Sequence, residues 1–124
     1  MNIAVITGAS SGLGKEYAAA VAEGRPELDE IWVIARRADR LEELKKQLGD
    51  KIRPVPMDIT DPAAVEKYRA ELESSDAKVL LLINNAGFGK LGNFDELSTE
   101  DNAGMVRLNC EALTVISSVT LPFM

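Results

Sequence analysis

Short apolar runs alternate with longer amphipathic segments along this chain. The runs cover residues 3–6, 31–34, 52–57 and 79–83, and within them apolar residues largely follow one another. Continuous apolar runs are typical of strands that helices cover on both faces, whereas half-exposed strands alternate apolar with polar residues. Because helix-length segments separate the runs, the pattern predicts a parallel sheet in a three-layer, doubly wound α/β fold.

The segments between the runs carry helix-end signals. We expect helices over 13–23 and 38–48, each followed by a glycine that ends it. A third helix should begin at Asp61-Pro62, with aspartate as the cap and proline in the first helical position. The last helix should begin within 98–101, and its inner face should comprise Met105, Leu108, Ala112 and Val119.

Two prolines identify the place of the third strand in the sheet. Pro54 and Pro56 lie inside the third apolar run. Proline lacks the amide hydrogen that a central strand donates, so it is confined to sheet edges, bulges and strand ends. A strand order of 3-2-1-4, which is typical of doubly wound nucleotide-binding sheets, places the third strand at the edge. We therefore expect residues 1–124 to form one domain with this order.

Composition excludes several classes of function. A net charge of -6 argues against a nucleic-acid partner, and a chain with no histidine and the single Cys110 is a poor candidate for a metal site or a Ser-His-Asp hydrolase. The longest uncharged apolar stretch, residues 79–83, is too short to cross a membrane, and no basic leader precedes the first strand. We expect a cytoplasmic protein without a metal or a membrane partner.

A glycine-rich turn follows the first strand directly and opens the first helix. It places Gly8, Gly12 and Gly14 around Ser10 and Ser11. Glycine permits a tight turn and a close approach of backbone to phosphate, and the following helix N-terminus offers unpaired N–H groups. We favour a phosphate-binding turn over a turn that merely joins strand to helix.

Three segments together resemble the classical short-chain dehydrogenase/reductase family. They are Thr7-Gly8-x-x-x-Gly12-x-Gly14, then Asn84-Asn85-Ala86-Gly87 after the fourth strand, and Leu108-Asn109 in the last helix. The resemblance covers essentially the whole chain and implies a Rossmann-type sheet, a nicotinamide dinucleotide and a small carbonyl or alcohol substrate. The residues that it assigns to the cofactor are Gly8, Ser10, Ser11, Gly12, Leu13, Gly14, Asp58, Ile59, Asn85, Ala86 and Gly87. Asp58 and Ile59 would meet the adenine, and Asn85 is equally open to a structural role.

The end of the second strand selects between the two nicotinamide cofactors. A carboxylate there accepts hydrogen bonds from the ribose of NAD(H), whereas arginine accommodates the 2′-phosphate of NADP(H). This chain has Ala35-Arg36-Arg37, so NADP(H) is favoured, with Arg36 as the first candidate and Arg37 as the second. The alternative is that both arginines only solvate the loop or start the helix 38–48.

Asn109 resembles the helix asparagine that helps to hold a water in this family's proton relay to a catalytic lysine. Such a residue often accompanies a local break in the helix. Without the resemblance, Asn109 would be read as an exposed polar residue.

The family's catalytic serine and Tyr-x-x-x-Lys pair have no counterpart in these residues. Tyr17 and Tyr68 are followed four positions on by Val21 and Leu72, and we expect both tyrosines to pack. We therefore expect the truncated, cofactor-binding half of an NADP(H)-dependent oxidoreductase. One alternative is a non-catalytic nucleotide-binding or interaction module. Another is a nucleotide-sugar or methyl-donor Rossmann protein, but such domains often have an acidic residue at the end of the second strand, where this chain has Ala35-Arg36-Arg37.

The fourth strand raises the question of assembly. Residues 79–83 would be central in a complete sheet of this family but form an apolar edge here, and exposed edges pair with other chains. We expect either a homo-oligomer formed through this edge and the helix 100–124, or a fragment of a longer product.

Overall fold

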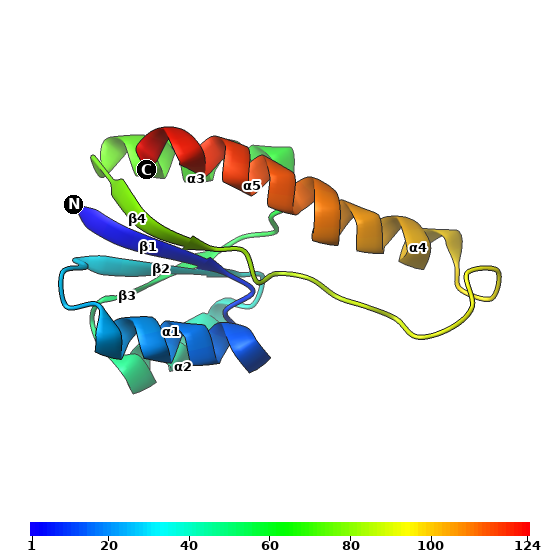
Figure 1. Ribbon diagram of the computed structural model, residues 1–124, viewed down its shortest axis with the longest axis horizontal. Helices are drawn as coiled ribbons and strands as arrows, with labels where there is room; N and C mark the ends of the chain where they lie inside the picture. Colours follow the sequence, from blue (N-terminus) through cyan, green and yellow to red (C-terminus); the bar gives the residue numbers. More distant parts are fainter.

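The computed structural model describes residues 1–124 and confirms the parallel, doubly wound sheet. Its strands are β1 (Asn2–Thr7), β2 (Glu30–Ala35), β3 (Ile52–Pro56) and β4 (Lys78–Ile83). All neighbouring strands pair in parallel, in the order β3-β2-β1-β4. One face of the sheet is covered by α1 (Gly12–Gly24) and α2 (Ala38–Leu48), and the other by α3 (Pro62–Ser74) and α5 (Leu113–Thr120) (Figure 1). This is the expected three-layer fold.

The sheet separates two apolar cores because side chains alternate between its faces. Along β1, Ile3 and Val5 belong to the core under α3 and α5, whereas Ala4 and Ile6 belong to the core under α1 and α2. All four are fully buried. Burial on both faces explains why the strands read as continuous apolar runs.

The two edges of the sheet differ. β3 is an edge strand, as Pro54 and Pro56 predict, and Arg53 lies over the Trp32 ring of β2 with its Cζ 4.2 Å from the ring centroid. At the opposite edge, β4 pairs only with β1, and the register shifts between Ile3 and Ala4. Residues 80–83 of β4 are all apolar and only half-buried, so apolar side chains are partly exposed at this edge.

Most helix ends match the caps expected from the sequence, but α1 continues through Gly24 and has Arg25 as its C-cap residue. The Asp61 carboxylate accepts a hydrogen bond from the Ala63 amide at 3.1 Å at the start of α3. Gly49 ends α2 with a φ of 104°, a conformation that favours glycine. The Ser98 hydroxyl accepts from the Asp101 amide at 3.0 Å and starts the last helical segment.

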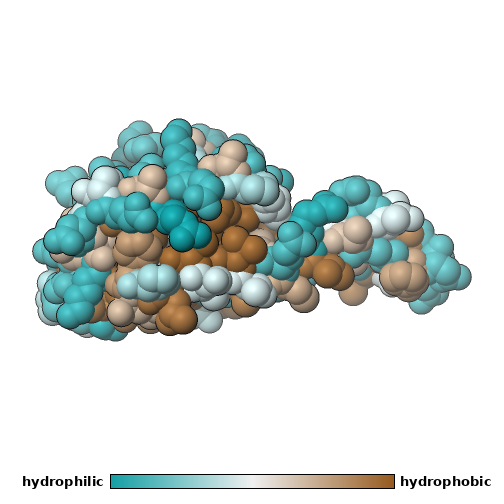
Figure 2. Space-filling model, turned by 90° about the horizontal axis from the view of Figure 1, so that it is seen from above, coloured by the Kyte–Doolittle hydropathy of each residue, from teal (hydrophilic) through white to brown (hydrophobic).

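That last segment is one helical rod with an internal irregularity. It runs through α4 (Thr99–Val106), the π-helical turn η1 (Arg107–Ala112), α5 and the 3-10 turn η2 (Leu121–Phe123). α4 contains no buried residue, and burial begins at Ala112, which packs against the sheet with Ile116 and Val119. α4 and the loop before it project beyond the sheet (Figures 1 and 2). No helix in the chain combines the length and apolarity needed to span a bilayer.

The expectation for the tyrosines is confirmed for Tyr68 and wrong for Tyr17. Tyr68 is 1% exposed, its hydroxyl lies 2.8 Å from the Thr120 hydroxyl, and burial raises the pKa of Tyr68 to about 12. Tyr17 is 41% exposed. The buried stripe of α1 consists of Gly14, Ala18 and Val21, and Tyr17 lies beside that stripe rather than on it.

Candidate functional site

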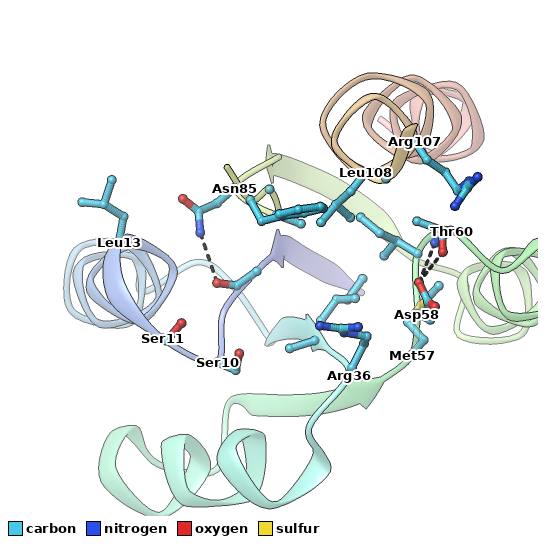
Figure 3. A pocket seen from close by; sticks show the side chains of 18 of the residues that line it. Ser10, Ser11, Leu13, Arg36, Met57, Asp58, Thr60, Asn85, Arg107 and Leu108 are labelled. Atoms are coloured by element: carbon cyan, nitrogen blue, oxygen red, sulfur yellow. Dashed lines mark hydrogen bonds between the residues drawn. The ribbon is translucent and has the colours of Figure 1, made fainter. Parts of the chain in front are cut away.

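A cavity of about 790 Å³ lies at the carboxyl ends of the strands. The chain passes from β1 outward to β2 and β3, and then crosses to β4 on the other side of β1. The crevice at such a reversal is where doubly wound sheets bind ligands. Residues from the turn after β1, from the ends of the other strands and from α4 and η1 line it (Figure 3).

Most of the residues that the sequence assigns to a cofactor meet at this cavity. Those that line it are Gly8, Ser10, Ser11, Leu13, Arg36, Asp58, Ile59, Asn85, Ala86 and Gly87. Gly12, Gly14, Arg37 and Asn109 do not line it. Residues from four separate strand ends therefore converge on this cavity.

The glycines shape the first wall of the cavity through the backbone. A Cβ on Gly14 would lie 2.0 Å from the Gly8 carbonyl oxygen, and a Cβ on Gly8 would lie 2.8 Å from the Ala86 backbone. Gly8 and Gly12 have φ values of 66° and 54°. No side chain caps the start of α1, where Ser11 is the N-cap, so its first N–H groups are left for a ligand or water.

Thr7, a motif residue to which the sequence assigned no role, joins the turn to the end of β4. Its buried hydroxyl accepts hydrogen bonds from the amides of Asn85 at 3.1 Å and Ala86 at 3.0 Å. The Asn85 side chain donates to the Gly8 carbonyl at 3.1 Å, which is the structural role left open for it. The sequence does carry a signal for this role: a threonine at the end of an otherwise apolar strand is buried, and a buried hydroxyl needs a hydrogen-bond partner.

The two arginines after β2 have different environments. Arg36 is exposed and lines the cavity (Figure 3). Arg37 is the N-cap residue of α2 and binds Asp39, with Nη2 3.0 Å from Oδ2. That hydrogen bond holds the pKa of the Asp39 carboxyl below its usual range. The structure brings Arg36 to the cavity and leaves Arg37 at the helix start.

Asp58, which the family resemblance places against the adenine, also holds a local turn. Its Oδ1 accepts hydrogen bonds from the Thr60 hydroxyl at 2.7 Å and the Thr60 amide at 2.9 Å. These bonds, followed by the charge of Arg36, lower the pKa of the Asp58 carboxyl. Asp61 does cap α3, but Asp58 also closes a local turn, because an aspartate readily accepts from the amide two residues on. Its Oδ2 forms no hydrogen bond within the chain and remains for a ligand.

Asn109 lies in η1, where the expected break in the helix is found. Its side chain forms two hydrogen bonds with the Phe88 backbone: Nδ2 donates to the carbonyl at 2.7 Å, and Oδ1 accepts from the amide at 2.9 Å. A Cβ on Gly87 would lie 2.9 Å from Asn109 Oδ1. The side chain therefore positions the loop after β4, while its part in a proton relay stays a prediction.

The wall of the cavity formed by α4 and η1 was largely missed. The lining residues that the sequence did not assign include Met57, Thr60, Glu100, Asp101, Gly104 and Arg107. Two ion pairs lie here, Arg107 with Glu100 at 3.2 Å and Lys90 with Asp101 at 2.8 Å. Periodicity gives the inner face of a helix but not which of its ends reaches a cavity. No group of three side chains suited to holding a metal ion is found.

Comparison with known proteins agrees with the geometry. The model of the family described as short chain dehydrogenase matches residues 2–124. Oxidoreductase UcpA of Salmonella typhimurium is 31% identical over 98% of this chain and 46% of its own length, and the NADP-dependent 3-hydroxy acid dehydrogenase YdfG of Escherichia coli is 30% identical over 98% and 48%. A short-chain dehydrogenase from Sphingobium yanoikuyae, solved with NADPH, superposes with a TM-score of 0.83 at 32% identity, over 98% of this chain and 48% of that one. The chain spans about half the length of these relatives. It belongs to the short-chain dehydrogenase family.

Proposed function

We propose that residues 1–124 form the cofactor-binding domain of an NADP(H)-dependent oxidoreductase that acts on a carbonyl or alcohol group. The observation that carries this proposal is the convergence of the glycine turn, Arg36 and the ends of β3 and β4 on one cavity at the strand reversal. The bound cofactor would supply the hydride, and this domain's own residues would bind and orient it.

The shape of the first wall fits a dinucleotide. Gly8 and Gly14 leave no room for a Cβ, so the turn is packed backbone against backbone and presents N–H groups rather than side chains. A pyrophosphate placed there would accept from the first amides of α1, with the Ser10 and Ser11 hydroxyls beside it. Ala86 and Gly87, which line the cavity, would lie beside a ribose, and Asp58 Oδ2 would accept a hydrogen bond from the adenine amino group.

Charge favours the phosphorylated cofactor. The end of β2 presents Ala35 and Arg36 to the cavity and no carboxylate. The nearby carboxylate of Asp39 is already paired with Arg37. A 2′-phosphate would therefore meet the unpaired guanidinium of Arg36, which offers a bidentate contact. Two relatives support this choice of cofactor: YdfG is named as an NADP-dependent dehydrogenase, and the Sphingobium dehydrogenase was solved with NADPH.

We also propose a cytoplasmic location for the protein.

A further part of the proposal is that the domain assembles with more protein. The outer edge of β4 has no neighbouring strand, and exposed apolar side chains follow along the last helical segment at Val106, Leu113, Val115 and Leu121. An unpaired, apolar edge beside an apolar helix needs a cover. We propose that either a second copy of the chain or a further part of the same protein provides it, and light scattering of dilute protein would show a dimer or larger species in the first case and a monomer in the second.

Calorimetric titration with NADPH and NADH tests the cofactor assignment. We expect NADPH to bind at least about tenfold more tightly, because a charge-assisted hydrogen bond to the 2′-phosphate contributes roughly 1.5–3 kcal/mol. Arg36→Ala should remove this difference, and Arg37→Ala, which changes the neighbouring arginine outside the cavity, should preserve it. Equal affinity of the unaltered protein for the two cofactors would contradict the proposal.

A further inference from the structure

Arg107 is a cation on the cavity wall that the proposed function leaves without a role. It is the first residue of η1, and its side chain is 47% exposed. From the rod formed by α4 and η1 it extends toward the side of the cavity where Asp58 and Thr60 lie (Figure 3). Arg36 approaches from the end of β2, so this end of the cavity has an arginine on two walls.

The partners of Arg107 leave most of its guanidinium available. One nitrogen, Nη1, donates to Glu100 at 3.2 Å, and no other hydrogen bond to its side chain is found. Glu100 is 81% exposed, and ion pairs of this kind contribute little because water competes for both charges. The planar face of the guanidinium is therefore free to lie against a flat ligand.

The surroundings of Arg107 are those of a base-binding wall rather than a phosphate-binding one. Leu108 beside it and Ile59 both line the cavity and are apolar, and Asp58 supplies a hydrogen-bond acceptor in the same cavity. An aromatic base prefers apolar contacts together with a cation over its face. A phosphate would avoid this wall, because the carboxylates of Glu100 and Asp101 also line it.

We propose that Arg107 stacks on the adenine ring of the bound cofactor and closes the adenine subsite from the α4 side. This inference rests on the proposed function. Arg36 would hold the 2′-phosphate through its N–H groups, while Arg107 would contact the base through its plane, so the two arginines would separate phosphate recognition from base recognition.

The test uses adenosine 2′,5′-bisphosphate, which carries the base and the phosphates, and reduced nicotinamide mononucleotide, which lacks the adenine. Arg107→Ala should weaken binding of the bisphosphate and of NADPH by about fivefold, the size of a partly exposed cation–π contact. Affinity for the mononucleotide should not change. A loss on the mononucleotide would place Arg107 at the other end of the cofactor and overturn the proposal.

Two further variants separate stacking from charge and from the ion pair. Arg107→Tyr keeps a flat face without charge and should restore bisphosphate binding relative to Arg107→Ala. Glu100→Gln breaks the same ion pair but keeps the guanidinium, and it should bind at least as tightly as the unaltered protein. If Arg107→Tyr remains as weak as Arg107→Ala, or if Glu100→Gln is equally weak, the stacking role is wrong.

The proposed function and this inference fail in different ways. If the unaltered protein binds neither NADPH nor the bisphosphate, the proposed function itself is wrong. If the unaltered protein binds both and Arg107→Ala binds equally well, only the role of Arg107 is wrong.

Discussion

The cavity lies between two regions that are held together by different forces. The body, which comprises the sheet with α1, α2, α3 and α5, buries whole strands in two apolar cores. The arm, residues 84–112, includes the loop after β4, α4 and η1, of which the loop and α4 project beyond the sheet (Figures 1 and 2). Ala112 is its only fully buried residue. Polar contacts hold the arm, mainly the Asn109 bonds to Phe88 and the pair between Lys90 and Asp101.

This difference assigns separate tasks to the two walls of the site. Dense apolar packing fixes the glycine turn and the strand ends to within narrow limits, which suits the recognition of a fixed pyrophosphate. A segment with few buried contacts opens locally at low cost. The arm is therefore the wall expected to adjust when a ligand enters, and the body is the wall expected to stay in place.

The largest contrast should come from truncating one apolar residue in each region. Ile116 of α5 is fully buried in the core between the sheet and the helices α3 and α5, and Val106 of α4 is 61% exposed. Ile116→Ala should lower the free energy of unfolding by about 2–5 kcal/mol, because it removes buried methyl groups and leaves a cavity. Val106→Ala should change it by less than about 0.5 kcal/mol. Urea denaturation of both variants measures this, and equal losses would show that the arm is packed like the body.

A second contrast lies within α1. Gly14→Ala would place a Cβ 2.0 Å from the Gly8 carbonyl oxygen, so the turn and helix must separate. We expect a loss of about 1–3 kcal/mol together with loss of nucleotide binding. Gly24→Ala at the other end of the same helix has open space around the added methyl group and serves as the control. Thermal unfolding should leave the control at or slightly above the unaltered protein, and a tolerated Gly14→Ala would contradict the close packing.

Removing the polar clamp should loosen the arm without unfolding the body. Asn109→Ala deletes both hydrogen bonds to the Phe88 backbone. Exchange of the Phe88 amide hydrogen should accelerate by about tenfold, the loss of roughly one net hydrogen bond. Amides in β1 and β2 should exchange at their original rates. Accelerated exchange throughout the sheet would mean that arm and body unfold together.

The smallest expected effect is a pH dependence at the boundary of the body. Hydrogen bonds from Thr60 lower the pKa of Asp58 in the folded protein. A lowered folded-state pKa adds stability above the unfolded value, about 3.9, and that contribution is lost as pH falls through the folded value. Asp58→Asn keeps an oxygen that can accept from Thr60 but does not titrate. Its stability should fall less steeply from pH 5 to pH 2 in chemical denaturation, and identical slopes would exclude a contribution from this turn.

Much of the body could be predicted from the sequence because its signals are local. Continuous apolar runs gave the strands, Asp61-Pro62 gave the start of α3, and Pro54 with Pro56 gave the edge position of β3. The strand order was the one typical of doubly wound nucleotide-binding sheets, with which the edge prolines agreed, and the glycine spacing with the Asn84–Gly87 segment and Leu108-Asn109 indicated the family. Each signal depends on neighbours within one element, so tertiary packing had little power to override it.

The remaining features depend on geometry between elements. The rotation of α1 about its axis leaves Tyr17 exposed, and the first turn of α2 takes Arg37 away from the cavity. The local turn at Asp58 competes with a ligand role for one of its oxygens. Arg107 had no signal, because its place on the cavity wall depends on how far α4 projects from the sheet.

The most direct test of the account is a ¹⁵N-amide NMR titration of the protein with NADPH. We expect the largest shifts at the amides of residues 8–14, 36, 59 and 86–88, with smaller shifts along α4 and η1 and none on the far ends of α2 and α3. Shifts in that pattern would place the cofactor between body and arm as proposed. Saturable binding that shifts other amides, or no shift at millimolar NADPH, would contradict a cofactor site at this cavity.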